Sequence, residues 1–175
     1  MGYVILGVGA AGITAAKTIR KAEKEAEITM ISTDRQVHSR CMLHKYLSHE
    51  RTAEKLSFVP EDFFETNRIH WIKGKTVTGL DTAKKKVILE DGGEVPYDKL
   101  LIATGAESFI PPVGNLREAA NVFGLRHLHD AEAIDRADRH HRFRPGGAGC
   151  GLRSDGNRKE GIHCGDGRSD PAYSA

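Results

Sequence analysis

The stretch Gly7-Val8-Gly9-Ala10-Ala11-Gly12 decides the fold of this 175-residue chain. It follows an apolar run, Tyr3–Leu6, that predicts a buried strand, and it opens residues 10–24, whose apolar side chains recur at helical spacing. In a G-x-G-x-x-G turn the first glycine permits the tight turn, the second lets the backbone approach a pyrophosphate, and the third lets helix and strand pack closely. The N–H groups at the helix start then bind the phosphates.

The residues after this helix supply the context that a lone glycine hexapeptide lacks. Residues 27–32 (EITMIS) predict a second strand, so that a strand, a helix and a strand follow one another, as in the unit that builds parallel sheets. The acid that holds the ribose of a dinucleotide is expected near the end of this second strand. Ser32 and Asp34 both stand there, and either could contact the ribose hydroxyls; we favour Asp34 over its alternative use as a turn residue.

The rest of the chain falls into two unlike parts. Residues 1–135 carry a net charge of −1 and residues 136–175 one of +3, and hydrophobic periodicity stops after Arg136, so we predict disorder from Arg139 onward. Before that point, strands are predicted over residues 69–72, 76–80, 86–90, 94–97 and 100–103 (the last one buried), and helices over 42–49, from 60, and over 130–137.

Composition excludes several classes of protein. No apolar run approaches the ~20 residues that cross a bilayer, and the N-terminus does not resemble a signal peptide, so we expect a cytoplasmic protein without membrane contact. The basic tail lacks the interleaved aromatic residues of a nucleic-acid-binding segment, and we expect no nucleic acid partner. No metal site is predicted, because Cys150, His163 and Cys164 lack a Cys-x2-Cys spacing. Residues 74–76 imitate the end of a P-loop but lack its first glycine.

A second motif follows about 90 residues after the glycine turn. The stretch Tyr97-Asp98-Lys99-Leu100-Leu101-Ile102-Ala103-Thr104-Gly105-Ala106, together with residues 7–12, resembles the pyridine nucleotide-disulfide oxidoreductases over residues 3 to about 136. The resemblance implies an α/β fold: a Rossmann-like FAD-binding domain with a parallel sheet and an added antiparallel β-meander, here incomplete. It also implies that the glycine turn holds FAD and that residues 103–105 lie beside the cofactor.

Two further segments are similar to one branch of that family. Ser39-Arg40-Cys41-Met42-Leu43-His44-Lys45 resembles the Arg-Pro-x-Leu-Ser-Lys segment of rubredoxin, ferredoxin and nitrite reductases, which implies that Arg40 and Lys45 lie against the flavin. Residues 125–131 resemble that branch's Leu-Arg-x-x-x-Asp-Ala, and Val77 fits the position that meets the adenine. The expected cofactor-binding residues are Gly7, Gly9, Ala10, Ala11, Gly12, Ser32, Asp34, Arg40, Lys45, Val77, Ala103, Thr104, Gly105 and Arg126.

Cys41 is the candidate catalytic residue. It is similar to the single cysteine at the flavin face of NADH oxidases and coenzyme A-disulfide reductases, and the adjacent Arg40 would favour a thiolate. Those relatives have Ser-Phe-x-x-Cys-Gly where this chain has Ser-Arg-Cys-Met, and the Cys-x4-Cys pair of the wider family is absent. The alternative interpretation, which we favour slightly, is a small residue where relatives have proline.

The family also implies a second G-x-G-x-x-G, for NAD(P)H, soon after residue 134. The chain has Gly147-Ala148-Gly149-Cys150-Gly151, in which the last glycine comes one place early and no apolar strand precedes the motif. Reading the codons for residues 139–147 one nucleotide later allows Val-Ile-Ile-Gly-Ser-Gly-Pro-Ala-Gly, an apolar strand that enters a complete motif. We therefore hypothesise an FAD-binding domain over residues 1–136 and a frameshifted tail over 137–175.

The function implied by the resemblance is that of an FAD-dependent NAD(P)H oxidoreductase. Hydride passes from the nicotinamide to the flavin and electrons then pass to an acceptor such as rubredoxin, oxygen or a disulfide; this chain is a truncated version, expected to be inactive. Two alternatives stay open: a non-catalytic nucleotide-binding fragment and a single-site NAD-dependent dehydrogenase. The sequence leaves the oligomeric state open.

Overall fold

The computed structural model of the chain describes residues 1–142. Its strands form two sheets, a parallel one with the order β3-β2-β1-β7 and an antiparallel one with the order β4-β5-β6. The elements in chain order are β1 (Gly2–Leu6), α1 (Ala10–Ala22), β2 (Glu27–Ser32), a 3-10 turn (Arg40–Met42), α2 (Leu43–Leu47), a second 3-10 turn (Glu54–Leu56), α3 (Phe63–Thr66), β3 (Ile69–Lys73), β4 (Val77–Asp81), β5 (Lys86–Leu89), β6 (Glu94–Pro96), β7 (Lys99–Ile102) and α4 (Leu128–Arg142).

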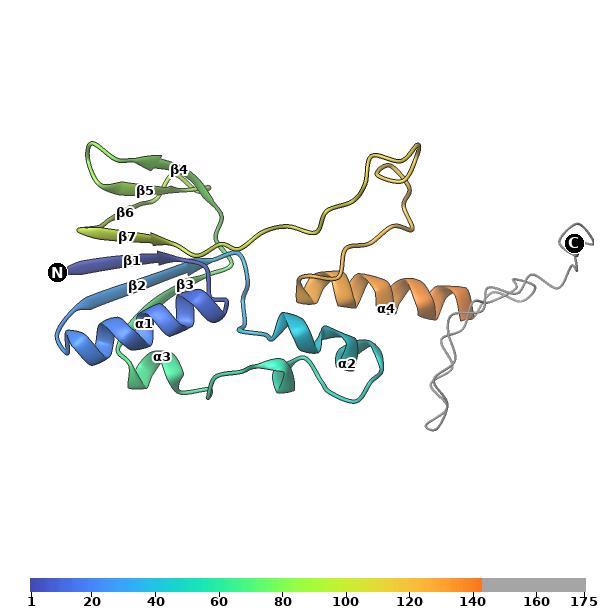
Figure 1. Cartoon of the computed structure of the whole chain (residues 1–175), viewed down its shortest axis with the longest axis horizontal. Helices are drawn as coiled ribbons and strands as arrows, with labels where there is room; N and C mark the ends of the chain where they lie inside the picture. The colour runs from blue at the N-terminus through green and yellow to red at the C-terminus, as the bar shows by residue number, and fades with distance from the viewer. Residues whose placement is uncertain (143–175) are drawn as a thin grey trace, which may run out of the picture.

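The parallel sheet is covered on both faces along its central strands. Side chains of β1 alternate between the faces: Ile5 packs on the side of α1, against Ile13, whereas Val4 packs with Val87 of β5. In Figure 1 the β4–β6 meander accordingly lies above the parallel strands, and α1 and α3 lie below them. The predicted strand–helix–strand unit and the predicted meander are both confirmed, within a few residues at each end.

Burial of β7 differs from the prediction. The strand is present and pairs with β1 in parallel, but Leu101 is 40% exposed and Ile102 is 62% exposed. An apolar run alone predicts a buried strand, whereas β7 forms the edge of the sheet and nothing in residues 1–142 covers its outer side chains. The chain then leaves the sheet through residues 103–127, which run outward and return to α4 (Figure 1).

The prediction of disorder from Arg139 is wrong for residues 139–142, which continue α4 to Arg142. The helix lacks a long apolar stripe and is held instead by its N-terminal half, where Ala131 is buried in a small cluster with Leu43 of α2. The exposed Arg139 also pairs with the buried Asp135 one turn earlier, at 2.8 Å. The prediction for the remaining tail, residues 143–175, lies outside the described residues.

Two further observations complete the fold. The helix predicted from Pro60 begins only at Phe63, because residues 60–62 form the preceding turn.

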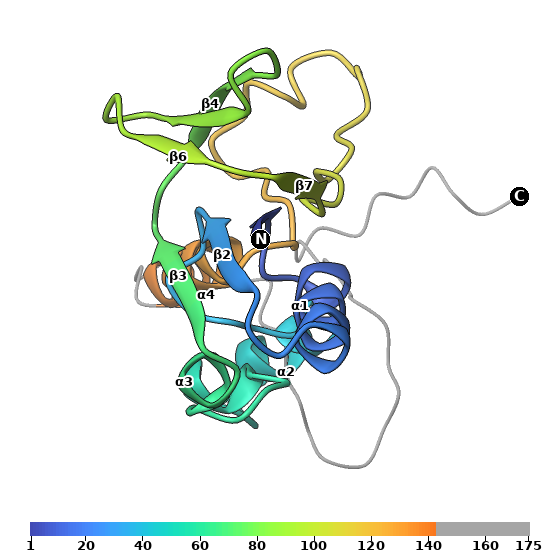
Figure 2. The same ribbon diagram turned by 90° about the vertical axis from the view of Figure 1, so that its left-hand side faces the viewer.

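None of the helices in residues 1–142 is both long enough and apolar enough to cross a membrane. Figure 2 views the molecule along the strands and shows α2 and α3 on the side of the parallel sheet opposite the meander.

Candidate functional site

The turn between β1 and α1 needs glycine at its first and third motif positions. Gly7 has φ +102°, and a Cβ there would lie 2.5 Å from the carbonyl oxygen of Ala103, at the end of β7. A Cβ on Gly12 would lie 2.1 Å from the carbonyl oxygen of Gly7. The first glycine therefore lets the turn pass close to β7, and the third lets α1 approach the strand, as the motif predicts.

The second glycine has a different environment. A Cβ on Gly9 would have no atom within 4 Å, so the fold itself does not require a glycine there. Gly9 is the N-cap of α1, no side chain caps the helix, and its first turn holds no acidic residue. The N–H groups of this turn and the positive end of the helix dipole are thus available to an anion that approaches the bare backbone at Gly9.

A cavity of about 230 Å³ lies at the carboxyl ends of β1, β2 and β7. This is the edge at which open α/β sheets bind ligands. Segments distant in the sequence meet in it, including the start of β4 and the residue before α4. Its lining consists of Leu6, Gly7, Val8, Gly9, Ile31, Ser32, Thr33, Asp34, Arg40, Lys75, Thr76, Val77, Ala103, Thr104, Glu107 and His127.

The structure separates the two candidates for the ribose-binding position. Ser32 is buried, and its hydroxyl accepts a hydrogen bond from Trp71 Nε1 at 3.0 Å while donating one to the Asp34 carbonyl at 2.9 Å. Its hydrogen-bonding capacity is therefore largely used within the fold. The Asp34 carboxylate lines the cavity, with its Oδ1 3.5 Å from His127 Nδ1. Of the two, Asp34 offers the acceptor that a pair of ribose hydroxyls needs.

Two arginines converge on the segment after β7. A Cβ on Gly105, which has φ +76°, would lie 2.6 Å from Arg126 Nη2 and 2.9 Å from Arg40 Nη1. Neither guanidinium pairs with a carboxylate of residues 1–142, and the Nε of Arg126 is buried without a hydrogen-bond partner. Both side chains are partly buried, and a buried Nε without a partner is unusual, so the pair favours an anionic ligand near Gly105.

Asp130 holds the backbone of this arginine segment in place. Its Oδ2 accepts hydrogen bonds from the backbone N–H of Arg126, at 3.0 Å, and from that of His127, at 2.8 Å. Burial alone raises the pKa of the Asp130 carboxyl, but these two hydrogen bonds and the neighbouring histidines bring the pKa below its ordinary value. The carboxylate is thus the stable form, and it fixes the residues that precede α4.

Comparison with known proteins shows the family to which this chain belongs. The profile of the family described as pyridine nucleotide-disulphide oxidoreductase matches residues 1–152. The chain belongs to this family. It is 34% identical over 141 residues to an NADH oxidase of Methanocaldococcus jannaschii, covering 77% of this chain and 31% of that protein. It is also 34% identical over 129 residues to a rubredoxin-NAD(+) reductase of Alcanivorax borkumensis, covering 73% and 33%.

Solved structures of reductases are also similar to this chain. The reductase in the covalent putidaredoxin reductase–putidaredoxin complex superimposes with a TM-score of 0.68 at 33% identity, over 78% of this chain and 34% of that one. NADH:rubredoxin oxidoreductase from Clostridium acetobutylicum gives a TM-score of 0.67 at 28% identity, over 81% and 37%. The chain spans about a third of the length of the curated relatives it matches.

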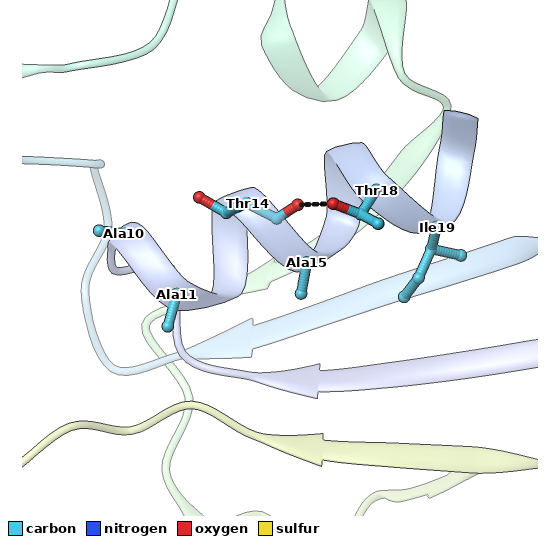
Figure 3. A pocket seen from close by; sticks show the side chains of 6 residues that line it. All are labelled: Ala10, Ala11, Thr14, Ala15, Thr18 and Ile19. Carbon is cyan, nitrogen blue, oxygen red and sulfur yellow. Dashed lines mark hydrogen bonds between the residues drawn. The ribbon is translucent and has the colours of Figure 1, made fainter. Parts of the chain in front are cut away.

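Some residues expected from the family resemblance lie away from the cavity. Ala10 and Ala11 instead line an open apolar groove of about 620 Å³ along α1, with Thr14, Ala15, Thr18 and Ile19 (Figure 3). The amine of Lys45 lies 3.4 Å from a carboxylate oxygen of Glu50. Cys41 carries an exposed free thiol that does not line the cavity. Their roles at the cofactor stay predictions.

Sequence reasoning missed three ionisable residues of the cavity. Lys75, set aside with the false P-loop, lies at the cavity wall, where its amine pairs with Asp91 at 2.7 Å. Glu107 and His127 meet there too, with His127 Nε2 3.4 Å from Glu107 Oε2. Their position depends on the outward path of residues 103–127, for which the sequence carries no periodic signal. Only the Leu-Arg-x-x-x-Asp-Ala resemblance pointed to the neighbourhood of His127.

Proposed function

We propose that residues 1–142 form the FAD-binding part of a flavin-dependent NAD(P)H oxidoreductase. The observation that carries this proposal is the convergence of a bare helix N-terminus, a cavity-lining carboxylate and an unpaired guanidinium in one cavity, at Gly9, Asp34 and Arg40. A dinucleotide needs each of these features, since it combines a pyrophosphate with a ribose diol.

The described residues fit FAD at its adenosine and pyrophosphate end. The N–H groups at the start of α1 would bind the pyrophosphate, and the carboxylate of Asp34 would accept the ribose hydroxyls. Val77 at the start of β4 would contact the adenine from the opposite wall. The unpaired Arg40 would place positive charge beside the segment Thr104–Gly105, on the path toward the flavin.

The redox reaction belongs to the cofactor, which when bound accepts a hydride and passes on electrons singly or in pairs. The names of the relatives support a nicotinamide donor, because they include an NADH oxidase and a rubredoxin-NAD(+) reductase. They also support an iron–sulfur protein of the rubredoxin or putidaredoxin kind as acceptor, and the complex with putidaredoxin adds to that support. A cytoplasmic location remains part of the proposal.

The frame hypothesis for residues 137–175 belongs to the same proposal. The change in charge and periodicity supports it, whereas α4 and the family match both continue past residue 136. With no complete second glycine motif, this chain is expected to turn over NAD(P)H poorly or not at all. Sequencing the coding DNA tests the hypothesis, and an uninterrupted frame through residue 175 would contradict it.

The visible spectrum of the purified chain tests the proposed function. Flavin bands near ~450 nm, retained through gel filtration or restored with added FAD, are expected, because the oxidised isoalloxazine absorbs there. A folded, colourless chain that takes up NADH but not FAD would contradict the proposal and favour a single-site NAD-dependent dehydrogenase. Bleaching of the bands by NADH then measures how much hydride transfer the chain retains.

A further inference from the structure

One cluster at the cavity contains two histidines that have no role in dinucleotide binding as proposed. Asp34 and His38 lie on the segment that follows β2, and His127 lies just before α4. One carboxylate oxygen and one ring nitrogen from each histidine come within 4.8 Å of one another. The grouping joins residues far apart in the sequence, so no motif spacing could have revealed it.

Both histidines of the cluster hold ring nitrogens that lack a hydrogen-bond partner. His38 is only 7% exposed, and its Nε2 is buried without a partner within the described part of the chain. The Nδ1 of His127 is also buried and makes no hydrogen bond in the described part of the chain, and it lies within ion-pair distance of Asp34 Oδ1, at 3.5 Å. Buried polar atoms are nearly always satisfied in native proteins, so the unpartnered His38 Nε2, beside a histidine and a carboxylate that make no hydrogen bond to each other, points to a missing partner.

The distances suit a metal ion as that partner. Zinc binds histidine nitrogen and carboxylate oxygen at about 2.0–2.2 Å, which places tetrahedral ligands roughly 3.3 Å from one another. The separation of Asp34 Oδ1 and His127 Nδ1, 3.5 Å, is already close to this value, and the three ligand atoms all lie within 4.8 Å of one another. On the other side of the ring, His127 Nε2 lies 3.4 Å from Glu107 Oε2. A carboxylate in that position commonly orients a metal-binding histidine.

We propose that Asp34, His38 and His127 bind a divalent first-row transition-metal ion, with zinc as the natural probe. One carboxylate and two imidazoles suit such an ion and leave coordination positions free. Asp34 and His127 line the cavity, so the ion would lie at its wall. The site goes beyond the proposed FAD function and does not rest on it. Since Asp34 serves both, the ion and the dinucleotide compete for this residue.

Calorimetric titration of the full chain with Zn²⁺, after EDTA treatment and without FAD, tests the proposal. Asp34→Asn, which preserves the shape of the side chain, and His38→Ala are each expected to weaken one zinc site by about tenfold or more. His70→Ala is the matched control, because His70 is an exposed histidine on β3 away from the cluster, and it should bind zinc as the unaltered chain does. Such a comparison discounts any zinc held by cysteines and histidines elsewhere in the chain.

Thermal unfolding followed by circular dichroism shows whether each variant is folded. Zinc is expected to raise the thermal unfolding midpoint of the unaltered chain and of the His70→Ala variant. It should raise the midpoint of the Asp34→Asn variant much less. If His38→Ala fails to fold, Asp34→Asn decides alone. Equal zinc isotherms for the unaltered chain and Asp34→Asn would overturn the proposal. Failure of FAD to bind would leave this zinc result unchanged, so the two proposals are tested separately.

Discussion

Strands β1 and β7 are neighbours in one sheet, and each ends in three branched aliphatic residues, yet the environments of these side chains differ. Val4 of β1 lies opposite Leu100, and Ile5 lies opposite Leu101, in parallel register. Ile5 is fully buried, while Leu101 is 40% exposed and the next residue, Ile102, is 62% exposed. β1 has a paired strand on each side and is covered by α1 and the meander, whereas β7 pairs on one side only.

The difference shows that an apolar run reports a preference for burial rather than burial itself. In β1 the apolar side chains find cover from elements within residues 1–142, and they form the core. In β7 the same kind of side chain faces outward at an edge whose backbone groups are also unpaired, a feature that other strands or chains readily cover. The stability of the fold should therefore depend far more on β1.

The largest expected effect comes from truncating β1. Ile5→Ala removes a fully buried side chain and should lower the free energy of unfolding by about 2–5 kcal/mol, whereas Ile102→Ala should lower it by less than ~1 kcal/mol. Urea unfolding followed by circular dichroism measures both. Equal losses of unfolding free energy in the two variants would mean that the side chains of β7 are as well covered as those of β1, and would contradict the difference between the two strands.

A slightly smaller effect is expected where the two strands approach each other at their carboxyl ends. Gly7→Ala introduces a Cβ that would lie 2.5 Å from the Ala103 carbonyl oxygen, at a residue with φ +102°. The variant should lose about 1–3 kcal/mol of unfolding free energy through strain and local displacement. Gly92→Ala, also at positive φ but with no atom near its Cβ, separates the cost of backbone strain from that of the close approach. Similar losses in the two variants would show that the approach to β7 costs nothing.

The smallest expected effect concerns the segment that returns from β7 to α4. The pKa of Asp130 is lowered in the folded chain, so its carboxylate stabilises the fold fully above the ordinary pKa near 3.8 and stabilises it less as the pH falls through the lowered value. Asp130→Asn should lower stability at pH 7 by about 1 kcal/mol and reduce the loss of stability on acidification below pH ~4. Urea midpoints from pH 3 to 7 measure this, and parallel pH profiles for the two proteins would contradict it.

The sequence carried the central parts of the fold because they depend on local patterns. The glycine turn, the β1–α1–β2 unit and the Asp91–Gly93 hairpin each combine a periodicity with a residue that a turn requires, and all are present. What the sequence could not supply depends on neighbours. The exposure of β7 follows from its place at the edge of the sheet, and the helical residues 139–142 follow from the packing and ion pair of α4.

The candidate site divides in the same way. Gly7, Gly9, Asp34, Arg40, Val77 and the Ala103–Thr104 pair, all expected from motifs, line the cavity. Lys75, Glu107 and His127 were missed because long-range folding alone brings them there. The choice between Ser32 and Asp34 also needed the structure, since only the hydrogen bond from Trp71 shows that the Ser32 hydroxyl is occupied.

Titration with FAD, followed by quenching of the flavin fluorescence, tests the central claim most directly. Gly9→Ala and Gly114→Ala form a matched pair, since a Cβ at either position would meet no atom within 4 Å, but only Gly9 lies at the start of α1 and in the cavity. We expect Gly9→Ala to weaken FAD binding by about tenfold or more, while Gly114→Ala binds as the unaltered chain does. Equal affinity of the two variants for FAD, or no binding by the folded unaltered chain, would contradict the proposed site.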